Sequence, residues 1–163
     1  MKVTTYQKVT TIVWKANIIK FGSPIIKFVE MKIKTLLPKG FIAGCMAAAA
    51  NIVIYLSAKL VGAINDSVLL PPGKPLELPP VIFSSLIPAI VASLLLFGLS
   101  QFAKNPVRVF TIIGVIFLLI SLGGPFGIPN LPASARAILA LMHIVAGGLI
   151  IYNLRKISNE HTL

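Results

Sequence analysis

Two polar side chains lie within long apolar stretches of the sequence, and they are the first candidates for chemistry. Asn51 lies in GFIAGCMAAAANIVI (residues 40–54), and His143 lies in LALMHIVAGG (residues 139–148). Polar groups are costly inside a bilayer and often mark functional sites. A carboxamide and a neutral imidazole can share a hydrogen bond, whereas a titrating histidine can relay a proton, sense pH or contact a ligand. Two interpretations therefore stay open, a structural polar pair and a binding site.

The pair can meet only if two antiparallel helices carry it across the membrane. Asn51 is about as far from the beginning of its apolar stretch as His143 is from the beginning of its own. Antiparallel spans would place both side chains at comparable depth, where an interhelical hydrogen bond contributes about 0.6–2 kcal/mol. We therefore predict a contact between Asn51 and His143.

The single cysteine suggests a different chemistry. Ile42-Ala43-Gly44-Cys45 has the form of a lipoprotein processing site, at which the cysteine would be lipidated. A signal peptide needs an apolar run of about 7–15 residues before that site, but Lys39 leaves too short a run. Apolar sequence also continues beyond Cys45 for a full helix length, so we predict an unmodified helix residue. One cysteine also excludes an internal disulfide and a paired-cysteine redox site.

Other catalytic and metal-binding patterns are missing from the sequence. It has no H-E-x-x-H motif, no phosphate-binding glycine loop and no Ser/His/Asp set. The only other histidine, His161, is in the polar tail, so haem ligation by two histidines would need a dimer. No Asp or Glu lies within the apolar stretches, which argues against carboxylate-driven transport. We therefore expect no metal, no cofactor and no enzymatic activity, with a redox carrier or enzyme that uses His143 as the alternative.

Composition assigns the chain to the membrane class. Only 12% of its 163 residues are charged, about half the share of a soluble domain, and the apolar residues form four long blocks. A membrane-spanning helix needs about 20 apolar residues, with a range of about 17–25. We therefore predict an all-α, multi-pass membrane protein with a four-helix transmembrane bundle at residues 40–154. Its predicted spans are about residues 40–64, 81–103, 107–122 and 133–154.

Proline and glycine set the predicted ends of several elements. Pro106 and Gly123-Gly124-Pro125 bracket the third span and should prevent it from lengthening. The connection at residues 65–80 holds five prolines, which favour an extended, semi-rigid structure packed over the outer face. Pro88 predicts a kink within the second span.

The positions of lysine and arginine predict the orientation. The segment before residue 40 holds eight lysines, the first connection one basic residue, the second two, the third none and the C-terminal tail two. Segments rich in basic residues thus alternate with segments poor in them, as the positive-inside rule requires of a chain with an even number of spans. We therefore predict both termini in the cytoplasm (N-in, C-in). We interpret the distribution of basic residues as a topology signal rather than as a nucleic-acid-binding surface. The basic residues expected to contact anionic lipid headgroups are Lys27, Lys32, Lys34, Lys39, Lys104, Arg108, Arg155 and Lys156.

The two ends of the chain lie outside the predicted bundle. Residues 1–39 are predicted as a basic segment, in which Ser23-Pro24 begins an amphipathic helix that lies in the inner headgroup region. The alternative is that Met31 is the true start of the protein. Residues 155–163 are predicted as a cytoplasmic tail.

Small residues recur every four positions at the start of the first span. Gly40, Gly44 and Ala48 would share one helix face, and Gly147 and Gly148 lie near the end of the fourth span. Small faces let two helix backbones approach closely. We predict that these residues pack the first and fourth helices together, and the alternative is a contact with a second copy of the chain.

Two short segments resemble a known family. They are Asn105-Pro106-Val107-Arg108-Val109-Phe110 and Leu141-Met142-His143-Ile144-Val145-Ala146-Gly147. Together with the small-residue first span and the proline-rich first connection, they resemble a family of uncharacterised four-helix bacterial integral membrane proteins, a domain of unknown function. The resemblance covers about residues 40–154. It implies the fold and the topology but no catalytic residues, and the lysine-rich N-terminus lies outside it.

These observations favour a small integral membrane protein of the bacterial cytoplasmic membrane that acts as a non-enzymatic accessory or interaction subunit. Its expected partners are membrane lipids, including anionic headgroups, and either a second copy of the chain or another membrane protein. Nucleic acid is not an expected partner. The alternative is a small-molecule or lipid-binding or transport protein, in which Asn51 and His143 line an intramembrane site.

Overall fold

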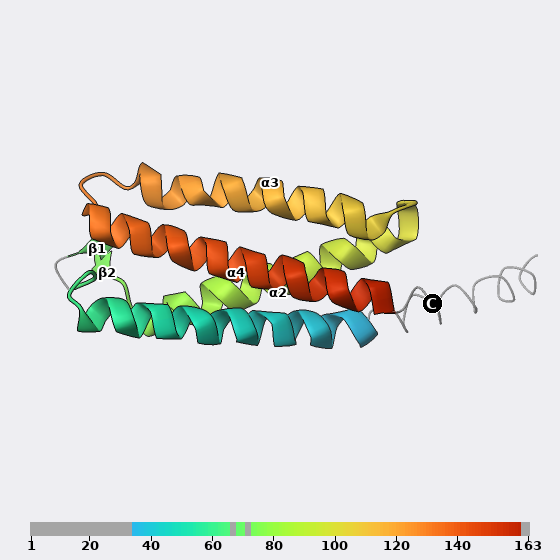
Figure 1. Ribbon diagram of the computed structural model, residues 1–163, viewed down its shortest axis with the longest axis horizontal. Helices are drawn as coiled ribbons and strands as arrows, with labels where there is room; N and C mark the ends of the chain where they lie inside the picture. Colours follow the sequence, from blue (N-terminus) through green and yellow to red (C-terminus); the bar gives the residue numbers. More distant parts are fainter. Residues whose placement is uncertain (1–33, 66–67, 71–72, 161–163) are drawn as a thin grey trace, which may run out of the picture. The chain divides into compact units, whose positions relative to one another are not determined.

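The computed structural model describes residues 34–65, 68–70 and 73–160 of the chain. It contains four helices that are long and apolar enough to cross a membrane, which confirms the all-α class and the predicted number of candidate spans. They are the first helix (Lys34–Leu60), α2 (Leu78–Phe102), α3 (Pro106–Gly127) and α4 (Ala133–Glu160). The chain divides after Thr35 into two compact units, and the helices pack together in the unit that begins at Leu36 (Figure 1).

Prolines begin two of the helices. Pro79 and Pro80 lie in the first turn of α2, and Pro106 is the first residue of α3. Proline fits this turn because its missing N–H would have no intrahelical acceptor there, and its fixed φ already suits a helix. The second span therefore begins before the predicted residue 81, since the two prolines are part of the helix rather than of the preceding loop.

A glycine ends the first helix earlier than predicted. Gly62 has a positive φ of 75°, a conformation that glycine adopts without steric cost. Its N–H donates to the Lys59 carbonyl at 3.1 Å, and the Ala63 N–H donates to the Ala58 carbonyl at 2.9 Å. This pair of bonds is the Schellman arrangement that satisfies the last carbonyls of a helix. The predicted end at residue 64 is therefore wrong, because the chain has already turned at Gly62.

The third span is longer than predicted. α3 continues through Gly123, Gly124 and Pro125 to Gly127, and Pro125 is buried within it. A proline inside a helix costs a backbone hydrogen bond, but membrane helices accommodate that loss more readily than soluble ones. The predicted stop at residue 122 is therefore wrong. α4 likewise continues beyond the predicted residue 154 to Glu160.

The predicted boundary at residue 40 does not interrupt the helix. The first helix already includes residues 34–39, so Lys34 and Lys39 are residues of the spanning helix itself. The predicted amphipathic helix that begins at Ser23, together with Lys27 and Lys32, lies outside the described residues.

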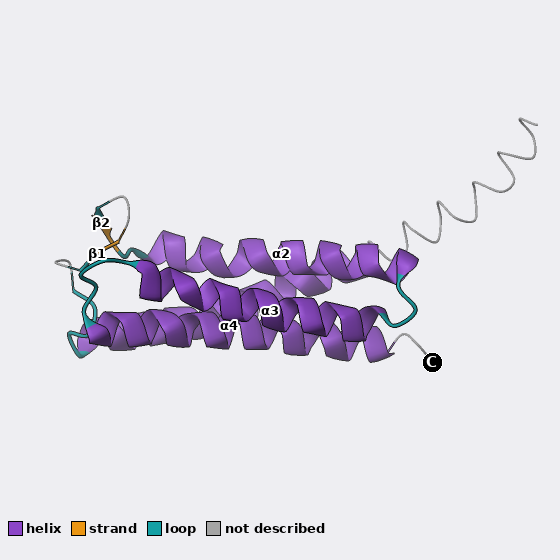
Figure 2. Cartoon of the chain, turned by 90° about the horizontal axis from the view of Figure 1, so that it is seen from above, coloured by secondary structure: helices purple, strands orange, loops and turns teal. Residues whose placement is uncertain are grey.

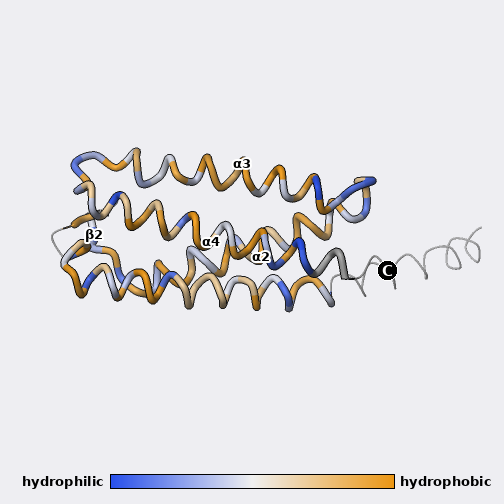
Figure 3. Tube along the Cα trace, viewed as in Figure 1, coloured by the Kyte–Doolittle hydropathy of each residue, from blue (hydrophilic) through white to orange (hydrophobic). Residues whose placement is uncertain are grey.

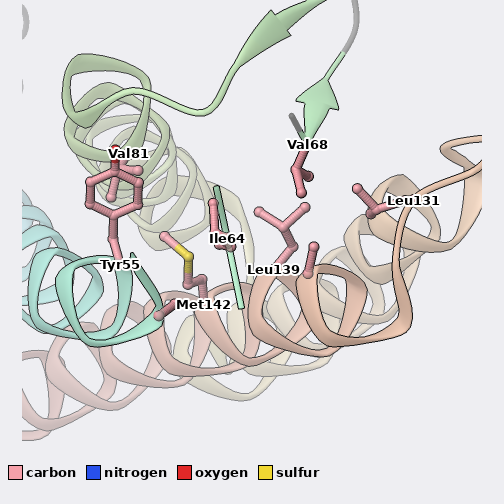
Figure 4. Packing of buried hydrophobic residues seen from close by; sticks show 9 residues of the cluster. Tyr55, Ile64, Val68, Val81, Leu131, Leu139 and Met142 are labelled. Carbon is pink, nitrogen blue, oxygen red and sulfur yellow. The ribbon is translucent and has the colours of Figure 1, made fainter. Parts of the chain in front are cut away.

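The connection between the first helix and α2 packs over one end of the bundle. Its described part contains a short antiparallel pair, β1 (Leu69–Leu70) and β2 (Lys74–Pro75), instead of the predicted proline-type extended structure (Figure 2). Ile64 and Val68 are both buried. They join side chains from the first helix, α2 and α4 in what we call the hairpin cluster (Figure 4). Its buried members are Tyr55, Ala58, Ile64, Val68, Val81, Leu131, Ala135, Leu139 and Met142.

A second cluster holds the four helices together farther from the hairpin. We call it the Phe110 cluster, and its buried members are Ala47, Ala89, Leu96, Phe110, Ile150 and Leu154. Outside the two clusters the helices expose large apolar side chains, as expected of helices that face lipid. Hydrophobic residues recur along all four helices (Figure 3). α3 is the helix least covered by the rest of the bundle. In its most apolar 18-residue stretch, 11% is buried, against 28–39% in the corresponding stretches of the other three helices.

Candidate functional site

A buried polar pair is formed by Asn51 of the first helix and Ser85 of α2. Asn51 is 3% exposed and Ser85 is fully buried. The Asn51 Nδ2 donates to Ser85 Oγ at 3.1 Å, and the Ser85 hydroxyl donates to the Val81 carbonyl of its own helix at 3.1 Å. The pair links two consecutive antiparallel helices.

Small residues bring these two helices close together. A Cβ placed on Gly40 would stand 2.5 Å from both Cβ and Oγ of Ser93, and one placed on Gly44 would stand 3.0 Å from the Ala89 Cβ. We call this contact the first seam; it comprises Gly40, Gly44 and Asn51 on the first helix and Ser85, Leu86, Ala89 and Ser93 on α2. Ala48, one turn after Gly44, is also buried.

The predicted partner of the small-residue face is therefore wrong. Gly40 and Gly44 face α2, not α4. In α4, Gly147 packs against Leu118 of α3, since its Cβ would meet the Leu118 Cδ1 at 2.7 Å, whereas a Cβ on Gly148 would meet nothing within 4 Å. Gly148 is thus not a packing residue within the described bundle. The spacing correctly identified a close-packing face on the first helix, but spacing alone carries no information about which helix covers it.

His143 lies in a different contact. Its Nδ1 is 2.7 Å from the Leu139 carbonyl oxygen, and because a carbonyl only accepts, Nδ1 is the donor in this contact. His143 precedes Gly147 by one helical turn, so both lie on the stripe of α4 that faces α3. The predicted hydrogen bond between Asn51 and His143 is therefore wrong, because each side chain uses a nearer partner.

Several other polar side chains in the spans bond to their own helices. Each donates to a carbonyl three or four residues earlier, which removes the need for a partner on another helix. They are Ser84, Ser93, Ser100, Thr111, Ser121 and Asn153. This pattern is expected of serine, threonine and asparagine in membrane helices and assigns these side chains a structural role.

Sequence reasoning missed two polar contacts. Ser85 was overlooked as the partner of Asn51, although antiparallel neighbours joined by one connection are the simplest arrangement. Tyr55, one turn after Asn51, donates its hydroxyl to the Leu76 carbonyl at 2.9 Å and so fastens the connection to the first helix. The Lys59 Nζ lies 5.8 Å from the centre of the Tyr55 ring, within the range of a cation–π contact.

Basic residues gather at the end of the bundle opposite the hairpin. α2 ends, α3 begins, and α4 ends there, beside the start of the first helix (Figure 1). The predicted lipid-contacting residues near these helix ends are Lys39, Lys104, Arg108, Arg155 and Lys156, and we call this region the basic end. Among the described residues, no three potential metal ligands lie together.

Comparison with known proteins identifies the family of the chain. No curated protein and no solved structure matches the chain. A family model matches residues 32–160, which include all four spans and more than half of the chain. This match confirms the resemblance noted from the sequence, and it extends a few residues beyond each end of the region expected. The chain belongs to the family described as Family of unknown function (DUF6069).

Proposed function

We propose that this chain is a non-enzymatic accessory or interaction subunit of a bacterial cytoplasmic membrane. The observation that carries the proposal is how its intramembrane polar groups are used. Asn51, His143 and the hydroxyl groups of the spans bond to the bundle's own helices. Of these contacts, the Asn51–Ser85 bond joins two helices and the others lie within one helix, so the side chains do not form the convergent set that a reaction requires.

The charge distribution supports the N-in, C-in orientation. The basic end carries Lys39, Lys104, Arg108, Arg155 and Lys156, whereas the described residues at the hairpin end hold Lys59, Lys74 and Arg136 together with Glu77. A surplus of lysine and arginine in short connections and near helix ends is the usual mark of the cytoplasmic side. The same residues favour contact with anionic headgroups, each worth about 1 kcal/mol near the membrane surface.

The exposed surface of α3 supports a partner within the membrane. α3 packs on α4 and α2, and its remaining surface exposes large apolar side chains. They include Ile112, Ile116, Phe117, Leu119 and Ile120. A helix covered so sparsely by its own bundle can be covered by another membrane protein or a second copy of the chain, which is what an interaction subunit needs.

Purification in a mild detergent tests the proposed function. The tagged chain should retain a membrane-protein partner, or a second copy of itself, at a fixed ratio, and it should also retain anionic phospholipid, both measured by native mass spectrometry. Replacing Lys104 and Arg108 by glutamine should reduce the retained anionic lipid, whereas the matched change of Lys74 at the other end should not.

A second variant separates this proposal from a ligand-binding role. His143→Ala should leave the partner ratio and the bound lipid unchanged, because the histidine bonds only to its own helix in the described bundle. A chain that purifies alone, and that loses a bound small molecule when His143 is replaced, would contradict the interaction role and favour binding or transport.

A further inference from the structure

The Asn51–Ser85 pair leaves a hydrogen-bonding deficit inside the bundle. Asn51 is only 3% exposed, and its buried Oδ1 accepts no hydrogen bond from the described residues. Exchanging the oxygen and nitrogen of the carboxamide does not remove the deficit. Ser85 would then donate to Oδ1, and Nδ2 would be left without an acceptor. One serine hydroxyl satisfies one side of a carboxamide, which has an acceptor and two donors.

The Ser85 hydroxyl proton is available for a second acceptor. It donates to the Val81 carbonyl at 3.1 Å, but the Ser84 hydroxyl donates to the same oxygen at 3.0 Å. In an α-helix this oxygen also accepts the Ser85 N–H. A carbonyl oxygen has two lone pairs, so three donors compete for it. The Ser85 proton can therefore serve another acceptor without leaving Val81 unsatisfied.

Pro88 leaves a further acceptor in the same turn of α2. In a regular helix the residue at position 88 would donate its N–H to the Ser84 carbonyl, but proline has no N–H. The first helix approaches the α2 backbone in this turn, since a Cβ on Gly44 would stand 3.2 Å from the Leu86 Cα. The Ser84 carbonyl belongs to the residue directly before Ser85, the partner of Asn51, so the unsatisfied groups on the two helices lie within one turn of α2.

We propose that a single water molecule is bound in the first seam, held by Asn51, Ser85 and the Ser84 carbonyl. The water donates to Asn51 Oδ1 and to the Ser84 oxygen and accepts the Ser85 hydroxyl proton. Buried waters typically make about three hydrogen bonds to otherwise unsatisfied groups. A neutral molecule that both donates and accepts satisfies either orientation of the carboxamide, which an ion cannot do. Asn51 and Ser85 are too buried for a larger alcohol to enter from the lipid.

Nuclear magnetic resonance on the ¹⁵N-labelled full chain in detergent micelles tests the proposal. The signals of the Asn51 side-chain amide are assigned as those that are missing from the spectrum of the Asn51→Leu variant. In a nuclear Overhauser spectrum, these amide protons should show a cross-peak at the frequency of water, and the sign of that cross-peak should be the one expected of a long-lived bound water. Visible Asn51 signals without such a cross-peak would overturn the proposal, and so would a cross-peak to detergent or lipid protons in its place.

Variants of α2 identify the groups that hold the water. Ser85→Ala should abolish the cross-peak on Asn51, and Pro88→Ala should weaken it because the restored N–H satisfies the Ser84 carbonyl. Ser93→Ala is the matched control, since Ser93 is also buried in the first seam but donates to the Ile90 carbonyl at 2.7 Å. It should leave the cross-peak unchanged. A cross-peak that keeps its full intensity in both Ser85→Ala and Pro88→Ala would overturn the assignment.

Discussion

Replacing Gly40 by leucine should prevent the first helix from packing on α2. Even the first carbon of the new side chain would stand 2.5 Å from the Ser93 Cβ and 3.2 Å from the Ala89 carbonyl oxygen. Neither atom is the end of a flexible side chain, so the helices themselves would have to separate. Overpacking of this kind costs about 1–3 kcal/mol, and occasionally more. We expect a large drop in the midpoint of thermal unfolding in detergent, together with a lower yield of folded protein.

A glycine without neighbours provides the control. Gly98 is also within a helix, but a Cβ there would meet nothing within 4 Å. Gly98→Leu should therefore change stability little, or raise it through better helix propensity. Ser93→Gly should partly rescue Gly40→Ala, because it removes both side-chain atoms that the new methyl would meet. Equal stability of Gly40→Leu and Gly98→Leu would show that the first seam does not exist.

Replacing Phe110 by alanine should be the most damaging truncation in the core. Phe110 is 1% exposed and is the largest fully buried side chain described. It belongs to the Phe110 cluster, whose other buried members come from the three other helices. A phenylalanine-to-alanine change in a soluble core costs about 3–5 kcal/mol. In a membrane, lost packing rather than hydrophobic transfer supplies the cost, so we expect the lower part of that range, measured by denaturant titration in micelles.

The matched control lies on the same helix. Phe117 is 64% exposed and is not a member of the cluster. Phe117→Ala removes the same atoms but leaves no cavity in the bundle, so its effect should stay within about 0.5 kcal/mol. If the two variants were equally stable, the Phe110 cluster would not be the packing centre described here.

Much of the fold could be predicted from the lengths of the apolar stretches. Four stretches near the length of a membrane span predict four helices, and the structure contains them. The helix ends were harder to predict because one residue type has different effects at different positions. Gly62 ended a helix within apolar sequence, whereas Pro79 and Pro125 were incorporated into helices that were expected to exclude them.

The candidate site was predicted less well, and the reason is geometric. Asn51 was correctly identified as buried and polar, and Gly40 and Gly44 as close-packing residues. A helical repeat shows that a face exists, but the covering helix is chosen by side-chain shape in three dimensions. The short serine Ser85 could therefore not be distinguished from other serines that bond to their own helix. His143 was paired with the wrong group because equal depth does not imply an adjacent face.

Labelling of single cysteines tests the proposed arrangement in the membrane most directly. Lys74→Cys and Lys104→Cys would each be made in a Cys45→Ser background and exposed to a membrane-impermeant maleimide on intact bacterial cells. α2 separates the two positions, with Lys74 before it and Lys104 after it. The N-in, C-in bundle predicts that Lys74→Cys reacts in intact cells, and that Lys104→Cys reacts only after the cells are permeabilised. Reaction of both cysteines from the same side, or the reverse pattern, would contradict it.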